Sequence, residues 1–328
     1  MLRRCSKRLI ATTLALTLTS VAATRVFSQS SYPDRPIRIV VPFGPGGGVD
    51  VMARLFAEKA QPRLGVAVIV ENRAGASGTI GGLSVQQSPP DGYTLLFAPL
   101  THVMANLVMS KVPYDPVTDF TAVARVGETP MLVVMSAKMP QHTLAEVAAA
   151  ARERPSDWTV ATSGLGSAGH IASIELNNIS KANLTITPYR GTALALTDVI
   201  GGHVQLLIDS IITLLPPARD GKVKALAITS AKRSALAPDI PTAVESGMPT
   251  LEFTSWFGFF GPKGLPDDVV LKLNATFAEA ARELAQEGRL AAIGIEPVAE
   301  TPAAFASFVR RQVERNGKLL RDANFKPE

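Results

Sequence analysis

The sequence predicts an α/β protein of the doubly wound class with two domains, each built on a mostly parallel sheet. Short apolar runs alternate with segments of helical periodicity along most of the chain, which indicates strands covered by helices on both faces. The length of 328 residues favours two domains. Two glycine-rich turns, at residues 42–50 and 162–170, each connect a strand pattern to a helix pattern. Such turns present free backbone N–H groups at a helix start, where anions bind.

The predicted elements follow from these periodicities. In the first part we expect strands at 37–41, 66–70 and 94–98, and helices at 49–61, 79–87 and 102–110. Two extended runs follow at 121–126 and 131–136, separated by Gly127 and Pro130. The alternation then restarts, with helices at 144–152, 171–179, 193–200 and 212–218 and strands at 158–161, 184–188, 204–208 and 223–229. An extended run at 253–261 and helices at 267–286 and 302–321 complete the chain.

The order of these elements predicts two lobes. The runs at 131–136 and 225–230 are expected to cross between them. Lobe 1 then comprises residues 29–129 and 230–328, and lobe 2 comprises residues 130–229.

Residues 1–28 have the pattern of an export signal. Four basic residues precede an apolar run at 9–21, and small residues follow, with a cleavage position after Ala23 or Ser28. The run is shorter than the ~20 residues of a membrane span. We expect general secretory export, cleavage and a periplasmic location; twin-arginine export and a retained anchor are the alternatives.

The charge balance argues against a nucleic-acid-binding surface. The chain has 33 Lys and Arg against 28 Asp and Glu, and five of the basic residues lie in the export signal. The remaining 28 basic residues equal the acidic ones, so the mature chain is formally neutral. Cys5, the only cysteine, also lies in the signal, which leaves no disulfide, thiol nucleophile or cysteine metal site. The histidines have no metal-binding spacing, so neither a metal nor a cofactor is predicted.

The glycine turns match nucleotide and hydrolase motifs only in part. The first turn lacks the Gly-Lys-[Ser/Thr] ending of a P-loop. The second matches G-x-G-x-x-G at Gly164, Gly166 and Gly169, but no acidic residue ends the next strand to bind a ribose. The first glycine of G-x-S-x-G is missing around Ser167. An exported enzyme acting on a carboxylate, with Ser167 or His170 catalytic, is the alternative to a binding protein.

A third turn, at 72–82, also precedes a helix. Because the carboxyl ends of parallel strands meet at one edge, three such turns predict an anion-binding cleft. Tight turn geometry without a ligand is the alternative. Phe43 either joins the core or forms a wall of the cleft, and Asp50 is expected to cap N–H groups at a helix start. Asp209, at a strand end, either caps a loop or binds a donor group of a ligand.

Short motifs over nearly the whole mature chain resemble those of one family. They include Tyr32-Pro33-Asp34-Arg35-Pro36, Glu71-Asn72-Arg73-Ala74-Gly75, Pro90-Asp91-Gly92-Tyr93, Pro113-Tyr114-Asp115-Pro116, Tyr189-Arg190-Gly191 and Trp256-Phe257-Gly258. In combination with the first two turns they resemble the Bug family of periplasmic solute-binding receptors, the substrate-binding proteins of tripartite tricarboxylate transporters. The resemblance implies a two-lobed, hinged periplasmic binding protein fold of type II. It also implies a ligand carboxylate held between residues 43–50 and 163–170, partly through water.

We therefore predict a non-enzymatic extracytoplasmic receptor that captures a small carboxylate for uptake or sensing. A permease of the tripartite tricarboxylate type or a sensor is the expected partner, and a monomer is expected. Helix N-termini and a few charge-assisted N–H bonds suffice for micromolar binding, so no arginine is required. Tyr189 and Arg190 stand where the family keeps an aromatic–polar pair, and the distal end of the ligand remains unassigned. The predicted ligand-binding residues are Phe43, Gly44, Gly46, Gly47, Gly48, Asp50, Ser77, Thr79, Thr101, Ser163, Gly164, Ser167, His170, Tyr189 and Asp209.

Overall fold

The computed structural model describes residues 32–328, and Pro33–Glu328 form one compact unit. The predicted export signal and its cleavage position lie outside the described residues. None of the helices within 32–328 combines the length and apolar character needed to cross a bilayer.

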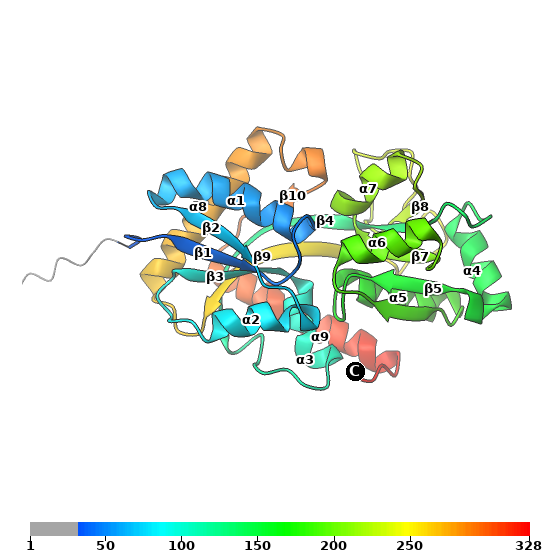
Figure 1. Ribbon diagram of the computed structural model, residues 1–328, viewed down its shortest axis with the longest axis horizontal. Helices are drawn as coiled ribbons and strands as arrows, with labels where there is room; N and C mark the ends of the chain where they lie inside the picture. The colour runs from blue at the N-terminus through cyan, green and yellow to red at the C-terminus, as the bar shows by residue number, and fades with distance from the viewer. Residues whose placement is uncertain (1–31) are drawn as a thin grey trace, which may run out of the picture. The chain divides into compact units, whose positions relative to one another are not determined.

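Two mixed sheets that share the strand β4 organise this unit (Figure 1). The strands of the first sheet are β1 (Ile37–Val41), β2 (Val68–Asn72), β3 (Thr94–Pro99), β9 (Thr254–Pro262), β4 (Phe120–Ser136) and β10 (Glu296–Pro297). Their order is β2-β1-β3-β9-β4, with β10 on β4. Strands β1, β2 and β3 are parallel, and β9 runs against both β3 and β4.

The second sheet has the order β8-β4-β7-β5-β6. Its other strands are β5 (Thr159–Thr162), β6 (Thr185–Pro188), β7 (Leu206–Ser210) and β8 (Val223–Ile228). Strands β5, β6 and β7 are parallel, and β4 runs against β7 and β8. Each sheet therefore consists mainly of strands in one direction, as predicted, with one long strand opposed to them.

Helices cover both sheets (Figure 1). Those beside the first sheet are α1 (Gly48–Leu64), α2 (Thr79–Gln86), α3 (Leu100–Val108), α8 (Asp267–Gln286) and α9 (Pro302–Asp322). Those beside the second are α4 (Leu144–Glu153), α5 (Ala168–Ser180), α6 (Thr192–Gly201) and α7 (Ile211–Arg219). Short 3₁₀ turns occur at η1 (Ala76–Gly78), η2 (Pro155–Asp157) and η3 (Ala291–Ile293). Most predicted elements are confirmed within two or three residues, and α8 has the predicted bounds.

Strand β4 corrects the prediction of two separate runs. It continues through Gly127 and Pro130, pairing with β9 over Phe120–Pro130 and with β7 and β8 from residue 131 onward. Gly127 pairs with Phe257 of β9 after a register shift at Val126, and a Cβ on Gly127 would lie 2.7 Å from a side-chain carbon of Ile295. Pro130 lies where the strand leaves one sheet and enters the other, so its missing N–H interrupts neither ladder.

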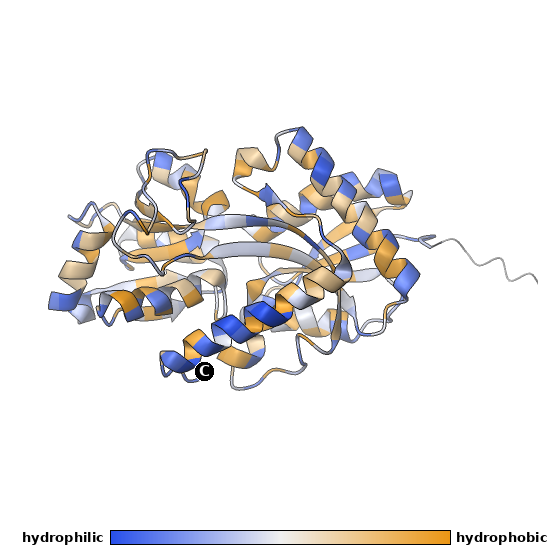
Figure 2. Cartoon of the chain, turned by 180° about the vertical axis from the view of Figure 1, so that it is seen from behind, coloured by the Kyte–Doolittle hydropathy of each residue, from blue (hydrophilic) through white to orange (hydrophobic). Residues whose placement is uncertain are grey.

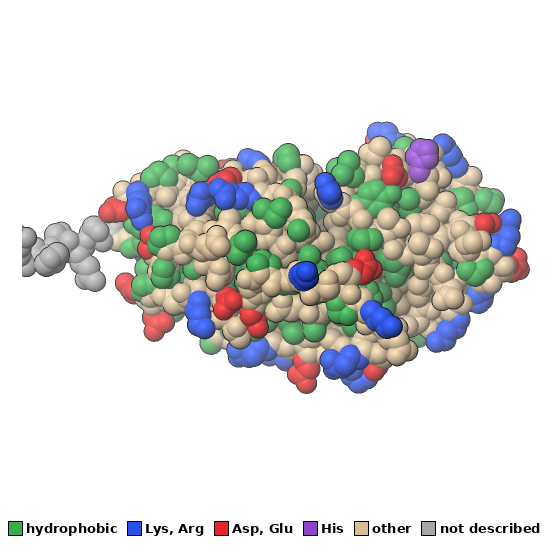
Figure 3. All heavy atoms as spheres, turned by 60° about the horizontal axis from the view of Figure 1, so that its bottom comes forward, with side chains coloured by type: hydrophobic (Ala, Val, Ile, Leu, Met, Phe, Trp, Pro, Cys, Tyr) green, Lys and Arg blue, Asp and Glu red, His purple; other side chains and the backbone are tan. Residues whose placement is uncertain are grey.

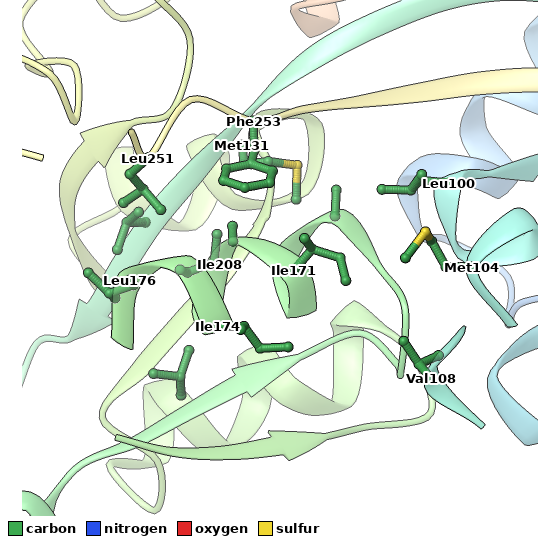
Figure 4. Close-up of a cluster of buried hydrophobic side chains, with 14 of the residues drawn as sticks. Leu100, Met104, Val108, Met131, Ile171, Ile174, Leu176, Ile208, Leu251 and Phe253 are labelled. Carbon is green, nitrogen blue, oxygen red and sulfur yellow. The ribbon is translucent and has the colours of Figure 1, made fainter. Parts of the chain in front are cut away.

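Each sheet with the helices beside it forms one half of the unit. One hydrophobic cluster extends across both halves. Figure 4 shows Leu100, Met104 and Val108 of α3 facing the group that contains Ile171 and Ile174 of α5. Helix α9 contacts α3, β4 and α5, and thus both halves. Figure 2 shows hydrophilic and hydrophobic residues side by side along α9, as expected for a helix with one buried face. On the face drawn in Figure 3, Lys and Arg are interspersed with Asp and Glu.

Candidate functional site

A cavity of about 240 Å³ lies at the strand-to-helix turns of both halves. Its walls come from the β1–α1, β3–α3, β5–α5, β6–α6 and β7–α7 turns, with Met131 of β4 and with Ser255 and Phe257 of β9. All of these turns follow the carboxyl ends of strands, which is the sheet edge where ligands bind in open α/β folds. The cavity has room for a small organic molecule.

Five helices, α1, α3, α5, α6 and α7, begin at the wall of this cavity. Ser167 and Ser210 cap α5 and α7 with their hydroxyl groups. Helices α1, α3 and α6 begin after Gly47, Pro99 and Gly191, without a side-chain cap. Because the first N–H groups of a helix have no partner within it, these starts direct donors and positive dipole ends toward the cavity. The arrangement favours an anion.

The first turn is stabilised by Asp50, which is buried at the third position of α1. Its carboxylate accepts hydrogen bonds from the Gly46 N–H at 3.0 Å, the Arg54 Nε at 3.1 Å and the Asn72 Nδ2 at 2.9 Å. Burial raises the pKa of Asp50, but the hydrogen bonds from Arg54, Gly46 and Asn72 together lower it by more, so the pKa lies below its usual value. The predicted helix cap is therefore not present, because the one backbone N–H that Asp50 bonds belongs to Gly46, which precedes the helix. Asp50 shapes the turn from behind and does not line the cavity.

The second turn brings three glycines close to neighbouring elements. A Cβ on Gly166 would lie 2.9 Å from the Cβ of Met104 on α3, and one on Gly169 would lie 1.9 Å from the carbonyl oxygen of Ile208 on β7. Gly164 lies against Ser77 of the first half. Close packing therefore accounts for these glycines, without a dinucleotide.

His170 completes the second turn. Its Nδ1 accepts a hydrogen bond from the Gly166 N–H at 3.2 Å, and its backbone N–H donates to the Ser167 Oγ at 3.0 Å. Burial lowers the pKa of His170 to about 4, so the imidazole is neutral at pH 7. The hydroxyl of Ser167 lines the cavity, whereas His170 does not.

Asp209 connects three turns of the second half. Its Oδ1 accepts from the Ser210 N–H at 2.7 Å, its Oδ2 accepts from the Thr192 Oγ1 at 3.0 Å, and Ser163 adds a side-chain hydrogen bond. Burial raises the pKa of Asp209 more than these bonds lower it. The carboxylate lines the cavity, but each of its oxygens already accepts a hydrogen bond from the protein.

The structure brings eight of the predicted residues to the cavity. These are Phe43, Gly44, Gly47, Gly48, Thr101, Ser163, Ser167 and Asp209. Ser77 and Tyr189 line a neighbouring hollow instead. Gly46, Asp50, Thr79, Gly164 and His170 line neither of the two. The binding roles of all fifteen residues stay predictions.

The sequence reasoning missed several residues of the cavity. The turn before α6 supplies Arg190, Gly191 and Thr192, and β9 supplies Ser255 and Phe257. The turn between β6 and α6 joins a strand to a helix as the first two turns do, and this pattern could have indicated Arg190, Gly191 and Thr192. No local pattern marks the residues of β9, because only its pairing with β3 and β4 brings it to the cavity.

Known proteins show the same fold. The structure of the periplasmic binding protein BugD is 34% identical, with a TM-score of 0.85 over 90% of this chain and 100% of BugD. Rpa4515 of R. palustris, solved with adipate, is 33% identical, with a TM-score of 0.87 over 90% of this chain and 100% of that one. MatC of Rhodopseudomonas palustris, solved with malate, is 34% identical, with a TM-score of 0.83 over 88% of this chain and 100% of that one. The predicted two-lobed periplasmic binding protein fold is confirmed.

The family model that matches residues 52–325 is the tripartite tricarboxylate transporter family receptor. The match spans both halves of the structure and four of the five helix starts at the cavity; it begins after the start of α1. This chain therefore belongs to the receptor family of the tripartite tricarboxylate transporters, as its resemblance to the Bug proteins indicated.

Proposed function

We propose that this protein captures a small carboxylate in the cleft between its lobes, for uptake by a tripartite tricarboxylate transporter permease or for sensing. The observation that carries the proposal is the convergence of five helix N-termini on one cavity. Relatives with similar folds were solved with adipate and with malate, both of which are carboxylates.

The energetics of such a site suit a reversible receptor. Each helix start contributes roughly 0.3–1 kcal/mol to an adjacent anion. Charge-assisted hydrogen bonds from N–H and hydroxyl groups contribute about 1.5–3 kcal/mol each. A few of them reach the ~8 kcal/mol of micromolar binding once ordering costs are subtracted. Thr101 and Ser167 also line this cavity, and their hydroxyls are available as further donors, whereas the Ser163 hydroxyl already bonds to Asp209.

Ligand capture would involve closure of the two lobes. The proposed lobes are residues 29–129 with 230–328, and residues 130–229. The shared strand β4 and the return segment after β8 connect them, so a hinge motion would bend the chain at these two places. Export by the amino-terminal signal, with cleavage near residue 28, would deliver the receptor to the periplasm.

Binding without chemical conversion is the proposed activity. Ser167 bonds to the backbone N–H of His170, and the imidazole Nδ1 accepts from Gly166, so neither contact activates the hydroxyl. The alternative is an exported enzyme that acts on a carboxylate through Ser167 or His170. Incubating the protein with each acid and following the acid by NMR separates the two, because a receptor leaves the ligand unchanged.

Thermal melting tests the proposal directly. The mature protein is unfolded, dialysed free of bound ligand and refolded, then melted with malate, adipate and other small carboxylates and with their amides. We expect an acid, but not its amide, to raise Tm, because binding to the native state stabilises it by mass action. Equal shifts with acid and amide, or no shift with any acid, would contradict the proposal.

A further inference from the structure

The cavity wall holds one cation that the binding scheme above does not use. Of the residues that line the cavity, only Arg190 and Asp209 carry a charge. Within the described residues 32–328, the guanidinium of Arg190 makes no ion pair or side-chain hydrogen bond, and its side chain is exposed. Most of the other arginines in this part of the chain have a hydrogen-bond or ion-pair partner, as Arg35, Arg125 and Arg289 do.

Asp209 is not the partner of Arg190. Its two oxygens accept from Ser210 and Thr192, and it is only 7% exposed. The two charges therefore lie at different depths, with the acid buried among protein donors and the cation toward solvent.

The backbone that carries Arg190 is held in place. The preceding Tyr189 donates its N–H to the Thr162 carbonyl at 2.8 Å and its hydroxyl to Asp198 of α6 at 2.6 Å. The following Gly191 has φ of 122°, which turns the chain into α6. The side chain thus projects from a fixed turn that borders both the cavity and the neighbouring hollow.

Besides the helix starts and Arg190, which directly precedes the start of α6, the cavity has apolar walls. Phe43, Val49, Leu194 and Phe257 line it, and Leu194 is 56% exposed, which places this side chain toward the opening. Apolar walls suit methylene groups, whereas a guanidinium suits a carboxylate, which it can bind through two parallel N–H bonds. A ligand with one carboxylate on the helix starts leaves Arg190 unpaired, but a second carboxylate would pair with it.

We propose that Arg190 determines specificity by binding the second carboxylate of a dicarboxylate, and so selects diacids over monoacids of the same length. This inference rests on the proposed function, since it assumes that the helix starts bind the first carboxylate. It gives a role to Arg190 at the distal end of the ligand, which the sequence analysis left unassigned.

The test compares diacids with their own monoamides, which have nearly the same size and shape but one charge fewer. Isothermal titration of the ligand-free protein with α,ω-dicarboxylates of four to eight carbons, malate and each monoamide gives Kd for every pair. For the acid that binds best, we expect a preference of about 10- to 100-fold over its monoamide. Arg190→Gln should reduce this preference to about threefold or less while leaving the Kd of the monoamide nearly unchanged. Arg190→Lys should retain part of it.

Arg154→Gln is the matched control. Arg154 is an exposed arginine of the same half that pairs with Asp157 away from the cavity, so its loss changes net charge equally. Three results would overturn the assignment of Arg190 while leaving carboxylate capture intact. They are a wild type that binds diacid and monoamide equally well, a preference for the diacid that survives Arg190→Gln, and an equal loss of affinity for diacid and monoamide in Arg190→Gln. A wild type that binds neither diacid nor monoamide would overturn the proposed function as well.

Discussion

The hydroxyl oxygen of Ser77 accepts a hydrogen bond from the backbone N–H of Leu165 at 3.2 Å, and this bond joins the two halves of the protein outside the cavity lining. Ser77 has φ of 50° and ψ of 32°, a left-handed conformation that is unfavourable for a serine. Gly164 packs against the same side chain. The strained turn at η1 therefore presents its hydroxyl to the β5–α5 turn, and the contact stabilises the approach of the two halves independently of any ligand.

Replacing Ser77 should weaken ligand retention. In Ser77→Ala the N–H of Leu165 loses its partner, which is worth about 0.5–1.5 kcal/mol, so we expect Kd to rise about 2- to 10-fold through faster dissociation. Stopped-flow dissociation of the acid that raises Tm most measures this. Ser84→Ala is the control, because the Ser84 hydroxyl bonds only to the Gly81 carbonyl of its own helix. An unchanged dissociation rate would show that the bond does not hold the closed state.

Asp50 should stabilise the fold at neutral pH. Its folded pKa is lowered below the ordinary value of 3.8, so its stabilising effect is present above that pH and is lost as pH falls through the folded pKa. Asp50→Asn should lower the unfolding free energy by about 1.5–3 kcal/mol at pH 7, because three donors lose a charged acceptor. Urea unfolding at pH 7 and pH 3 should show this deficit shrinking in acid. A deficit independent of pH would contradict the role of the charge.

Asp209 should have the opposite pH dependence. Burial raises its folded pKa above 3.8, so its contribution to stability is full below that pH and is lost as pH rises through the folded pKa. Melting curves from pH 3 to pH 7 should show the wild type gaining stability, relative to Asp209→Asn, as the pH is lowered. The exposed Asp220→Asn serves as control. A constant difference between wild type and Asp209→Asn would mean that this carboxyl has the same pKa in the folded and the unfolded protein.

Gly169 and Gly44 should differ sharply in their tolerance of a methyl group. In Gly169→Ala the new Cβ would lie 1.9 Å from the Ile208 carbonyl oxygen, so α5 or β7 must move. We expect a loss of about 1–3 kcal/mol or more, measured by urea unfolding. Gly44→Ala meets no atom within 4 Å and should change stability by less than about 0.5 kcal/mol. A tolerant Gly169 would mean that the helix start is not packed on the strand as described.

The fold could be predicted largely because its local signals agree. The run Ile37–Val41 is buried and paired on both sides, and Pro266 directly precedes α8, so periodicity and end signals coincide. Strand β4 was predicted wrongly as two runs because Gly127 and Pro130 normally interrupt strands. Its continuity depends on pairing with β9, more than 120 residues away, which no local window contains.

The sequence predicted where the site lies better than it predicted which residues line it. Glycine-rich turns before helices mark the edge of the sheet, and this placed Phe43, Ser163 and Ser167 at the cavity. The same signal also selected Asp50 and His170, whose side chains organise their turns from behind the wall. Sequence spacing shows that a residue belongs to a turn, but the direction of its side chain depends on partners such as Asn72.

The interspersed charges of the surface bear on how fast a ligand arrives. Residues 32–328 contain 28 basic and 28 acidic residues, and neither sign dominates the face in Figure 3. A protein without net charge exerts little long-range attraction on an anion, so the rate of encounter is set by free diffusion. Since screening by salt acts mainly on such long-range forces, the association rate should change little with ionic strength. A receptor of this kind collects its ligand equally well in dilute and in saline surroundings.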